Sequence, residues 1–187
     1  MPERIANKII LAEDAEQQNL VRRYLERCGH AAPFRLLPPT KGPDGSGEKY
    51  VRAQYSKEVH ACRSALGRRA SALLVVIVDA DTETTRWRAA QLSDALRAAG
   101  MDERLEDEPI VVLIPKRHVE TWIRALLGNQ VDEVTDYTKA PYLTPVPNDI
   151  KNAADELHQW TRPGTDPGPT SPASLTASIP EWRKIPS

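Results

Sequence analysis

The chain has 187 residues, of which 40% are hydrophobic and 27% are charged. This composition supports one compact domain with a tail, and it excludes both a large multidomain enzyme and a globally disordered chain. The 25 basic and 26 acidic residues leave a formal net charge of −1, so no overall positive field draws the protein to nucleic acid or to acidic lipid.

The first half of the chain alternates expected strands and helices. Residues 8–12 form a short apolar run that predicts a buried strand, and residues 15–27 have the helical spacing of apolar side chains. Residues 33–37 are a candidate second strand. They are followed by a loop rich in proline and glycine at 38–47 and by a helical pattern at 48–69.

The same alternation continues in the middle of the chain. Residues 72–78 are a β-branched run that is apolar on both faces, as in a central strand of a parallel sheet. A helix capped by Thr82 or Thr84 follows, and residues 110–114 form another buried strand. We therefore predict an α/β fold for residues 1–127, with a parallel four-stranded Rossmann-like sheet flanked by helices.

The last third of the chain has weaker signals. Residues 128–160 are interpreted as a helical extension, and residues 161–187 as an irregular tail that holds six of the 16 prolines. Trp182 and Arg183 in this tail resemble anchor residues of a protein interface.

Features of membrane, secreted and zinc proteins are missing from the sequence. The longest apolar run, residues 72–78, is too short to cross a bilayer, and the first eight residues lack the apolar segment of a signal peptide. Cys28 and Cys62 have no CxxC or CxxH partner, which argues against a disulfide framework and a thiolate zinc site. We expect a cytoplasmic protein without membrane contact.

Acidic residues follow two of the expected strands. Glu13 follows residues 8–12, and Asp79 and Asp81 follow residues 72–78. Ligands of open parallel sheets bind beyond the carboxyl ends of the strands, so we expect these carboxylates to face one crevice together with residues 116–118. Close like charges are costly unless a cation neutralises them, and Mg²⁺ prefers carboxylate oxygens. Helix capping and favourable first-turn acids are the plainer explanations of the same residues.

The order of these motifs resembles a known family. A strand ending in Glu, then a helix, a strand and a helix, and then a hydrophobic strand ending in Asp-x-Asp resembles the TOPRIM domain of topoisomerases, primases and old-type nucleases. The resemblance covers roughly residues 8–127. The stretch Pro115-Lys-Arg-His-Val-Glu-Thr-Trp122 also resembles the Glu-x-Trp element of small TOPRIM-like proteins found near old-type nucleases in prokaryotic defence systems.

This resemblance implies a nuclease that uses Mg²⁺ or Mn²⁺ to hydrolyse phosphodiester bonds of DNA or RNA. The metal ligands it implies are Glu13, Glu16, Asp79, Asp81 and Glu120. It implies Glu13, Asp79 and Asp81 as catalytic residues. If phosphodiester cleavage is the reaction, we expect Lys116 and His118 to be catalytic as well, with His118 assisting proton transfer and Lys116 and Arg117 binding phosphate. Because the chain has no Walker motif, an ATPase partner on another chain is expected.

Plainer explanations and rival functions remain open. Glu16 is equally well explained as an exposed helix charge, residues 116–118 as a solvated loop, and Trp122 as core packing. The glycine-rich loop at 42–49 does not match a P-loop and suits a flexible lid or a plain connector. A haloacid-dehalogenase-type phosphatase and a nucleotide-sugar transferase also use Asp-x-Asp, and both rank below TOPRIM. The rival of another class is a non-catalytic TOPRIM-like subunit that docks on an ATPase through its tail.

Overall fold

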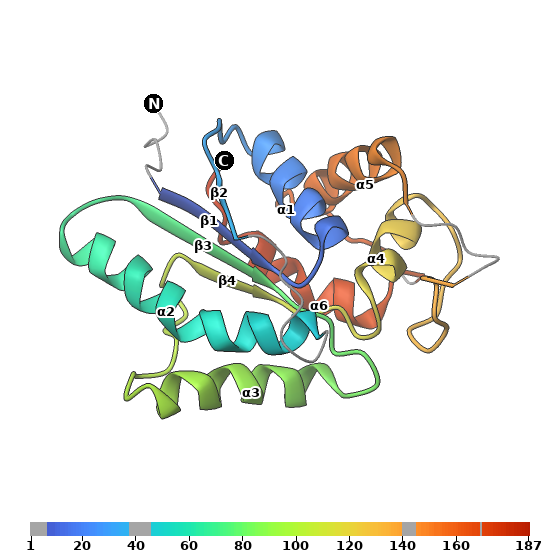
Figure 1. Ribbon diagram of the computed structural model, residues 1–187. Coiled ribbons are helices and arrows are strands. Elements are labelled where there is room, and N and C mark those ends of the chain that lie inside the picture. Colours follow the sequence, from blue (N-terminus) through green and yellow to red (C-terminus); the bar gives the residue numbers. More distant parts are fainter. Residues whose placement is uncertain (1–6, 38–45, 140–144, 169) are drawn as a thin grey trace.

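The computed structural model describes residues 7–37, 46–139, 145–168 and 170–187. Within these residues a four-stranded, all-parallel sheet has the strand order β2-β1-β3-β4 (Figure 1). The strands are β1 (Asn7–Ala12), β2 (Arg35–Leu36), β3 (Ala72–Ile77) and β4 (Ile110–Leu113). The helices are α1 (Ala15–Arg27), α2 (Gly47–Gly67), α3 (Thr85–Ala98), α4 (Val119–Leu126), α5 (Pro147–Trp160) and α6 (Ala173–Trp182). The predicted α/β fold with a parallel four-stranded sheet is therefore confirmed.

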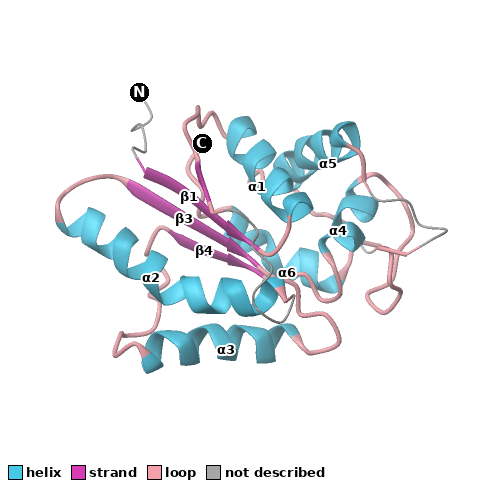
Figure 2. Ribbon diagram, viewed as in Figure 1, coloured by secondary structure: helices cyan, strands magenta, loops and turns pink. Residues whose placement is uncertain are grey.

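Helices cover the two faces of the sheet as two separate layers (Figure 2). Ile9 and Leu11 of β1 point into the layer of α2 and α3, while Ile10 and Ala12 point into the layer of α1, α4, α5 and α6. Side chains of a strand alternate between its faces, so a strand covered on both sides must be apolar throughout. All six residues of β3 are buried, as this position requires.

The register of the sheet aligns the ends of its strands. Ala12, the last residue of β1, pairs with Ile77, the last residue of β3, and Ile77 in turn pairs with Leu113, the last residue of β4. The segments that follow these three strands therefore emerge side by side at the carboxyl edge of the sheet.

The tail differs from its prediction. Residues 173–182 form α6, which packs against β4 and belongs to the same buried cluster as α1, α4 and α5. Trp182 is 0% exposed and lies 4.5 Å, centroid to centroid, from the Tyr24 ring. The expectation that Trp182 anchors a partner protein is wrong, because this side chain fills the core of its own chain. The nearby prolines concealed the short apolar face of α6.

The division of the chain into residues 1–127, 128–160 and 161–187 stays a prediction, although one buried cluster draws on all three segments. This cluster contains residues of all three segments, including Leu20, Leu157 and Leu175. Arg183 also donates a hydrogen bond from Nε to the carbonyl oxygen of Thr161 at 3.0 Å.

Helices α1 and α3 begin at polar residues of the sequence. Asp14 accepts the N–H of Gln17 at 2.8 Å and begins α1, and Thr84, one of the two predicted caps, accepts the N–H of Trp87 at 3.0 Å and begins α3. Residues 42–45 of the predicted lid or connector at 42–49 lie outside the described residues, and residues 46–49 form the cap and first turn of α2. No helix in the described part of the chain is long and apolar enough to span a bilayer.

Candidate functional site

The candidate site lies where the chain leaves β1, β3 and β4. Glu13 and Asp14 follow β1, Asp79 follows β3, and Glu120 lies in the first turn of α4 after β4. We call these four residues the acidic cluster. The gathering of Glu13 and Asp79 was expected from their positions after parallel strands, and the structure joins them directly.

Glu13 is fixed by backbone contacts on two sides. Its Oε2 accepts the N–H of Asp79 at 3.2 Å, and its own N–H donates to Oε1 of Gln17 at 2.9 Å. The first residue of α2, Gly47, lies so close that a Cβ there would be 2.5 Å from Glu13 Cγ and 2.7 Å from its carbonyl oxygen. Burial, with Asp14 and Glu48 adding to it, raises the pKa of the Glu13 carboxyl to about 6.

Asp79 is the most deeply buried acid of the cluster. It is 5% exposed, its Oδ2 lies 3.4 Å from Nδ1 of His118, and its Oδ1 is buried without a hydrogen-bond partner. Burial raises the pKa of this carboxyl well above its usual value, and Glu13, Asp14 and Glu120 raise it further. The nearby Gln17 amide lowers it, but Gln17 Nε2 is itself buried without a well-formed hydrogen bond, so this compensation is weak.

A buried arginine approaches Asp79 without neutralising its carboxyl group. Arg88 donates from Nε to the carbonyl oxygen of Asp79 at 2.9 Å and pairs through Nη1 with Glu48 at 2.5 Å. Its charge is thus shared with Glu48.

The remaining acids of the cluster lie on the α1 and α4 side. Burial is the main cause that raises the pKa of both the Asp14 and the Glu120 carboxyl. Glu16 raises both values further and His118 lowers both. Glu16 is half-buried in the first turn of α1.

Asp81 lies outside the acidic cluster. Residues two apart in a strand point to the same side, but β3 ends at Ile77 and Asp81 has a left-handed φ of 57° in the turn that follows, so alternation does not place Asp81 beside Asp79. Its side chain is 56% exposed, and its Oδ1 accepts a hydrogen bond from Nη1 of Arg117 at 3.1 Å. The alternation argument therefore does not apply to this pair.

A second group of charges surrounds His118. Its Nε2 lies 3.7 Å from Oδ1 of Asp136 and 4.0 Å from Oδ1 of Asp81, while Arg117 Nη2 lies 4.0 Å from Oδ2 of Asp136. We call Asp81, Arg117, His118 and Asp136 the ionic network. Hydrogen bonding from the Thr138 hydroxyl lowers the pKa of the Asp136 carboxyl. His118 connects this network to Asp79.

Lys116 is oriented by contacts with two other segments. Its Nζ donates to the carbonyl oxygen of Glu83 at 2.7 Å, and its backbone N–H donates to Oγ of Ser174 in α6 at 3.1 Å. The same Ser174 oxygen accepts Nε1 of Trp122 at 2.8 Å, and Trp122 is fully buried, which confirms that it packs in the core.

The residues at this edge match a hard divalent cation in chemistry but do not converge on a single point. Carboxylate oxygens are the preferred ligands of Mg²⁺, and Asp79 Oδ1 is a buried carboxylate oxygen without a hydrogen-bond partner. Yet in the ranges that the structure describes, no three His, Cys, Asp or Glu side chains are placed to hold one metal ion. A metal site would require side-chain rearrangement.

Sequence reasoning missed several residues that shape this edge. Gln17 lies one helical turn after Glu13, a spacing that could have drawn attention to it. Arg88 lies one helical turn after Thr84, the residue that begins α3, and this spacing could likewise have drawn attention to it. Asp136 has none, because it comes from a loop in the segment where the hydrophobic pattern is weakest.

Comparisons with known proteins add no relative: no family model, curated protein or solved structure matches the chain. The TOPRIM resemblance therefore stays a prediction, based on the motifs alone.

Proposed function

We propose that the chain is a TOPRIM-type nuclease that uses Mg²⁺ or Mn²⁺ and has the acidic cluster at its centre. The observation that carries the proposal is the excess of buried negative charge at the carboxyl edge of the sheet. Four carboxyl groups there have raised pKa values, and one oxygen of Asp79 has no partner. A divalent cation would remove this excess and reverse the local sign of the charge toward a phosphate.

Glu13 and Asp79 are the ligands best placed for this ion, because a hydrogen bond joins their two segments. Glu120 and Glu16 lie on the α1 and α4 side, and Asp81 would have to exchange Arg117 for the metal. When bound, the ion would polarise the phosphodiester and activate a water molecule.

The chain's own basic residues suit a phosphate group at the same place. Arg117 now contacts Asp81 and Asp136, and a phosphate oxygen could replace either carboxylate while keeping a charged hydrogen bond. Lys116 uses one N–H on the Glu83 carbonyl and retains two donors. His118 stands between Asp79 and Asp136, where it can hold or pass a proton.

The physiological setting is part of the proposal. We infer a cytoplasmic component of a prokaryotic defence system that acts on DNA or RNA together with an ATPase on another chain. The basis is the Glu-x-Trp stretch that ends at Trp122 and the lack of a Walker motif in the sequence.

The experiment combines metal binding with cleavage. Purified protein is titrated with Mg²⁺ or Mn²⁺ by calorimetry and incubated with plasmid DNA, single-stranded DNA and RNA. Glu13→Gln and Asp79→Asn should both lose cleavage and bind the ion more weakly. Glu103→Gln is the matched control, since Glu103 is an exposed acid paired with Arg97. Equal cleavage by the wild type and both cluster variants, or no binding of either ion, would overturn the proposal.

The second candidate function is a non-catalytic subunit that binds a partner ATPase. It is favoured by the ionic network, in which Arg117 and His118 already face the carboxylates of Asp81 and Asp136. Under this alternative, Asp79→Asn stabilises the protein, neither ion binds, and complex formation with the ATPase is retained.

A further inference from the structure

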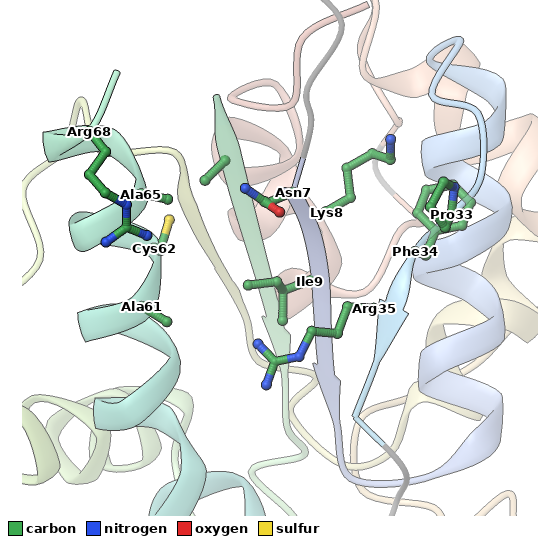
Figure 3. A pocket seen from close by; sticks show the side chains of 11 residues that line it. Asn7, Lys8, Ile9, Pro33, Phe34, Arg35, Ala61, Cys62, Ala65 and Arg68 are labelled. Atoms are coloured by element: carbon green, nitrogen blue, oxygen red, sulfur yellow. The ribbon is translucent and has the colours of Figure 1, made fainter. Parts of the chain in front are cut away.

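A cavity opens at the amino end of the sheet, opposite the acidic cluster. It has a volume of about 370 Å³ and lies between α2 and the start of β1, next to the short edge strand β2 (Figure 3). Small-molecule sites in proteins have volumes of roughly 300–1,000 Å³ and walls that are mostly apolar, with a few polar groups that fix orientation. The cavity meets both criteria without reference to the proposed nuclease function.

The sequence of α2 explains why this space is not filled. Val51, Tyr55 and Val59 of α2 pack against the sheet, whereas the small side chains Ala61, Cys62 and Ala65 line the cavity nearer the end of the helix. The helix therefore stays at the distance set by its large residues and leaves a gap at its small ones. The two-residue β2 is too short to close the flank.

The charged side chains that line the cavity are all basic. Lys8, Arg35 and Arg68 line it, and none of the described lining residues is acidic. Arg35 is already bound through both terminal nitrogens to Glu58, at 2.8 and 2.9 Å. Lys8 lies over the Phe34 ring, with Nζ 5.6 Å from the centroid. Arg68 follows the end of α2, and among the described residues it has no carboxylate within ion-pair distance.

The position of Arg68 indicates where the charged end of a ligand would lie in the cavity. Figure 3 shows its guanidinium on the same side of α2 as Cys62 and Ala65, at one end of the apolar wall that includes Ile9. A ligand that fits both features would place an apolar body against Ile9 and Ala65 and an anionic group on Arg68.

We propose that this cavity binds a small organic anion with an apolar body and a single carboxylate, sulfonate or phosphate group. The argument for this occupant is charge complementarity together with the volume and the apolar wall. A guanidinium that has no carboxylate partner in the described part of the chain supplies two parallel donors for such a group, and the small residues of α2 supply the space.

The probe for this site is 8-anilinonaphthalene-1-sulfonate, an aromatic sulfonate whose fluorescence rises in apolar surroundings. We expect one molecule to bind per chain, with the stoichiometry measured by calorimetry. Arg68→Gln should weaken binding about tenfold, since a charge-assisted hydrogen bond is worth on the order of one such factor or more. Ala61→Phe, which fills the cavity from its exposed rim, should abolish binding.

Matched controls distinguish binding in the cavity from nonspecific binding of the dye. Arg69→Gln changes a neighbouring exposed arginine that does not line the cavity, and it should leave the affinity unchanged. The uncharged analogue N-phenyl-1-naphthylamine should bind at least about tenfold more weakly than the sulfonate, for the same reason as Arg68→Gln. Near-ultraviolet circular dichroism checks that each variant keeps its packed core, because loosely packed states also bind such dyes.

Four outcomes would overturn the proposal. Binding that is unchanged in a folded Ala61→Phe variant would place the probe elsewhere. Equal affinity for the charged and uncharged dyes would remove the anionic part. Complete displacement of the dye by inorganic phosphate at a similar concentration would remove the apolar part. Tighter binding after removal of residues 2–6 would mean that these residues are the occupant. In each case the nuclease assay is unaffected, so the two proposals fail separately.

Discussion

At the carboxyl ends of β1 and β3, acidic side chains are buried together, whereas at the amino ends of the same two strands, cations surround an apolar cavity. The acidic cluster has excess buried charge. The cavity has space, and its cations are exposed, stacked on a ring or paired. The difference shows that the two ends would gain from different ligands: the cluster from a cation that relieves repulsion, and the cavity from a body that fills volume.

The largest expected effect tests whether the two ends belong to one folding unit. Trp182→Ala removes the fully buried ring that packs on Tyr24, and such truncations cost about 3–5 kcal/mol of unfolding free energy. Hydrogen exchange should show that β1 loses protection along its whole length in a single denaturant transition. A separate early transition confined to residues 161–187, with β1 unchanged, would instead make the tail an independent segment.

The comparison also shows what a sequence can and cannot reveal. Glu13 and Asp79 could be paired in advance, because residues that follow parallel strands must meet at one edge. The turn that takes Asp81 away depends on a single left-handed residue, which no hydrophobic pattern records. Asp136 and α6 reach the core and the site through long-range packing, and the cavity is lined by small residues of α2 together with the start of β1. These features depend on tertiary contacts rather than on local pattern.

The next effect concerns the acidic end alone. Gly47→Ala places a Cβ 2.7 Å from the carbonyl oxygen of Glu13 and 2.5 Å from its Cγ, so α2 or Glu13 must move. Overpacking of this kind costs about 1–3 kcal/mol. We expect a lower free energy of unfolding by urea denaturation, together with weaker Mn²⁺ binding if Glu13 is displaced. An unchanged stability would show that the contact between α2 and Glu13 is loose.

A pH titration should distinguish the two ends without any mutation. The folded pKa of Glu13 is raised from 4.5 to about 6, so its contribution favours the folded state below pH 4.5 and is lost as the pH rises through about 6. At 1.36 kcal/mol for each pH unit between these values, the loss is about 2 kcal/mol. The raised pKa of Asp79 acts in the same direction.

The control for this titration is the neutral variant. In metal-free buffer, Glu13→Gln should flatten the decline in unfolding free energy between pH 4.5 and 7, and Mg²⁺ should restore stability to the wild type at pH 7 in proportion to its binding. Arg68→Gln at the other end should keep the wild-type slope. A wild-type profile that is flat over this range would remove the evidence for excess charge in the cluster.

The smallest effect belongs to the amino end and uses the other end of the same helix. A Cβ on Gly67 would meet no atom within 4 Å, and Gly67 does not have a positive φ. Gly67→Ala should therefore stabilise the protein by about 0.4–1 kcal/mol, mainly because the unfolded chain loses conformational freedom. Because this substitution adds only a methyl group beside Arg68 and leaves its charge unchanged, binding of the aromatic sulfonate should stay within about twofold of the wild type, which is a difference of less than about 1 kcal/mol. A loss of binding with the stability gain intact would mean that the sulfonate lies against the surface of α2 at Gly67, where the added methyl group excludes it.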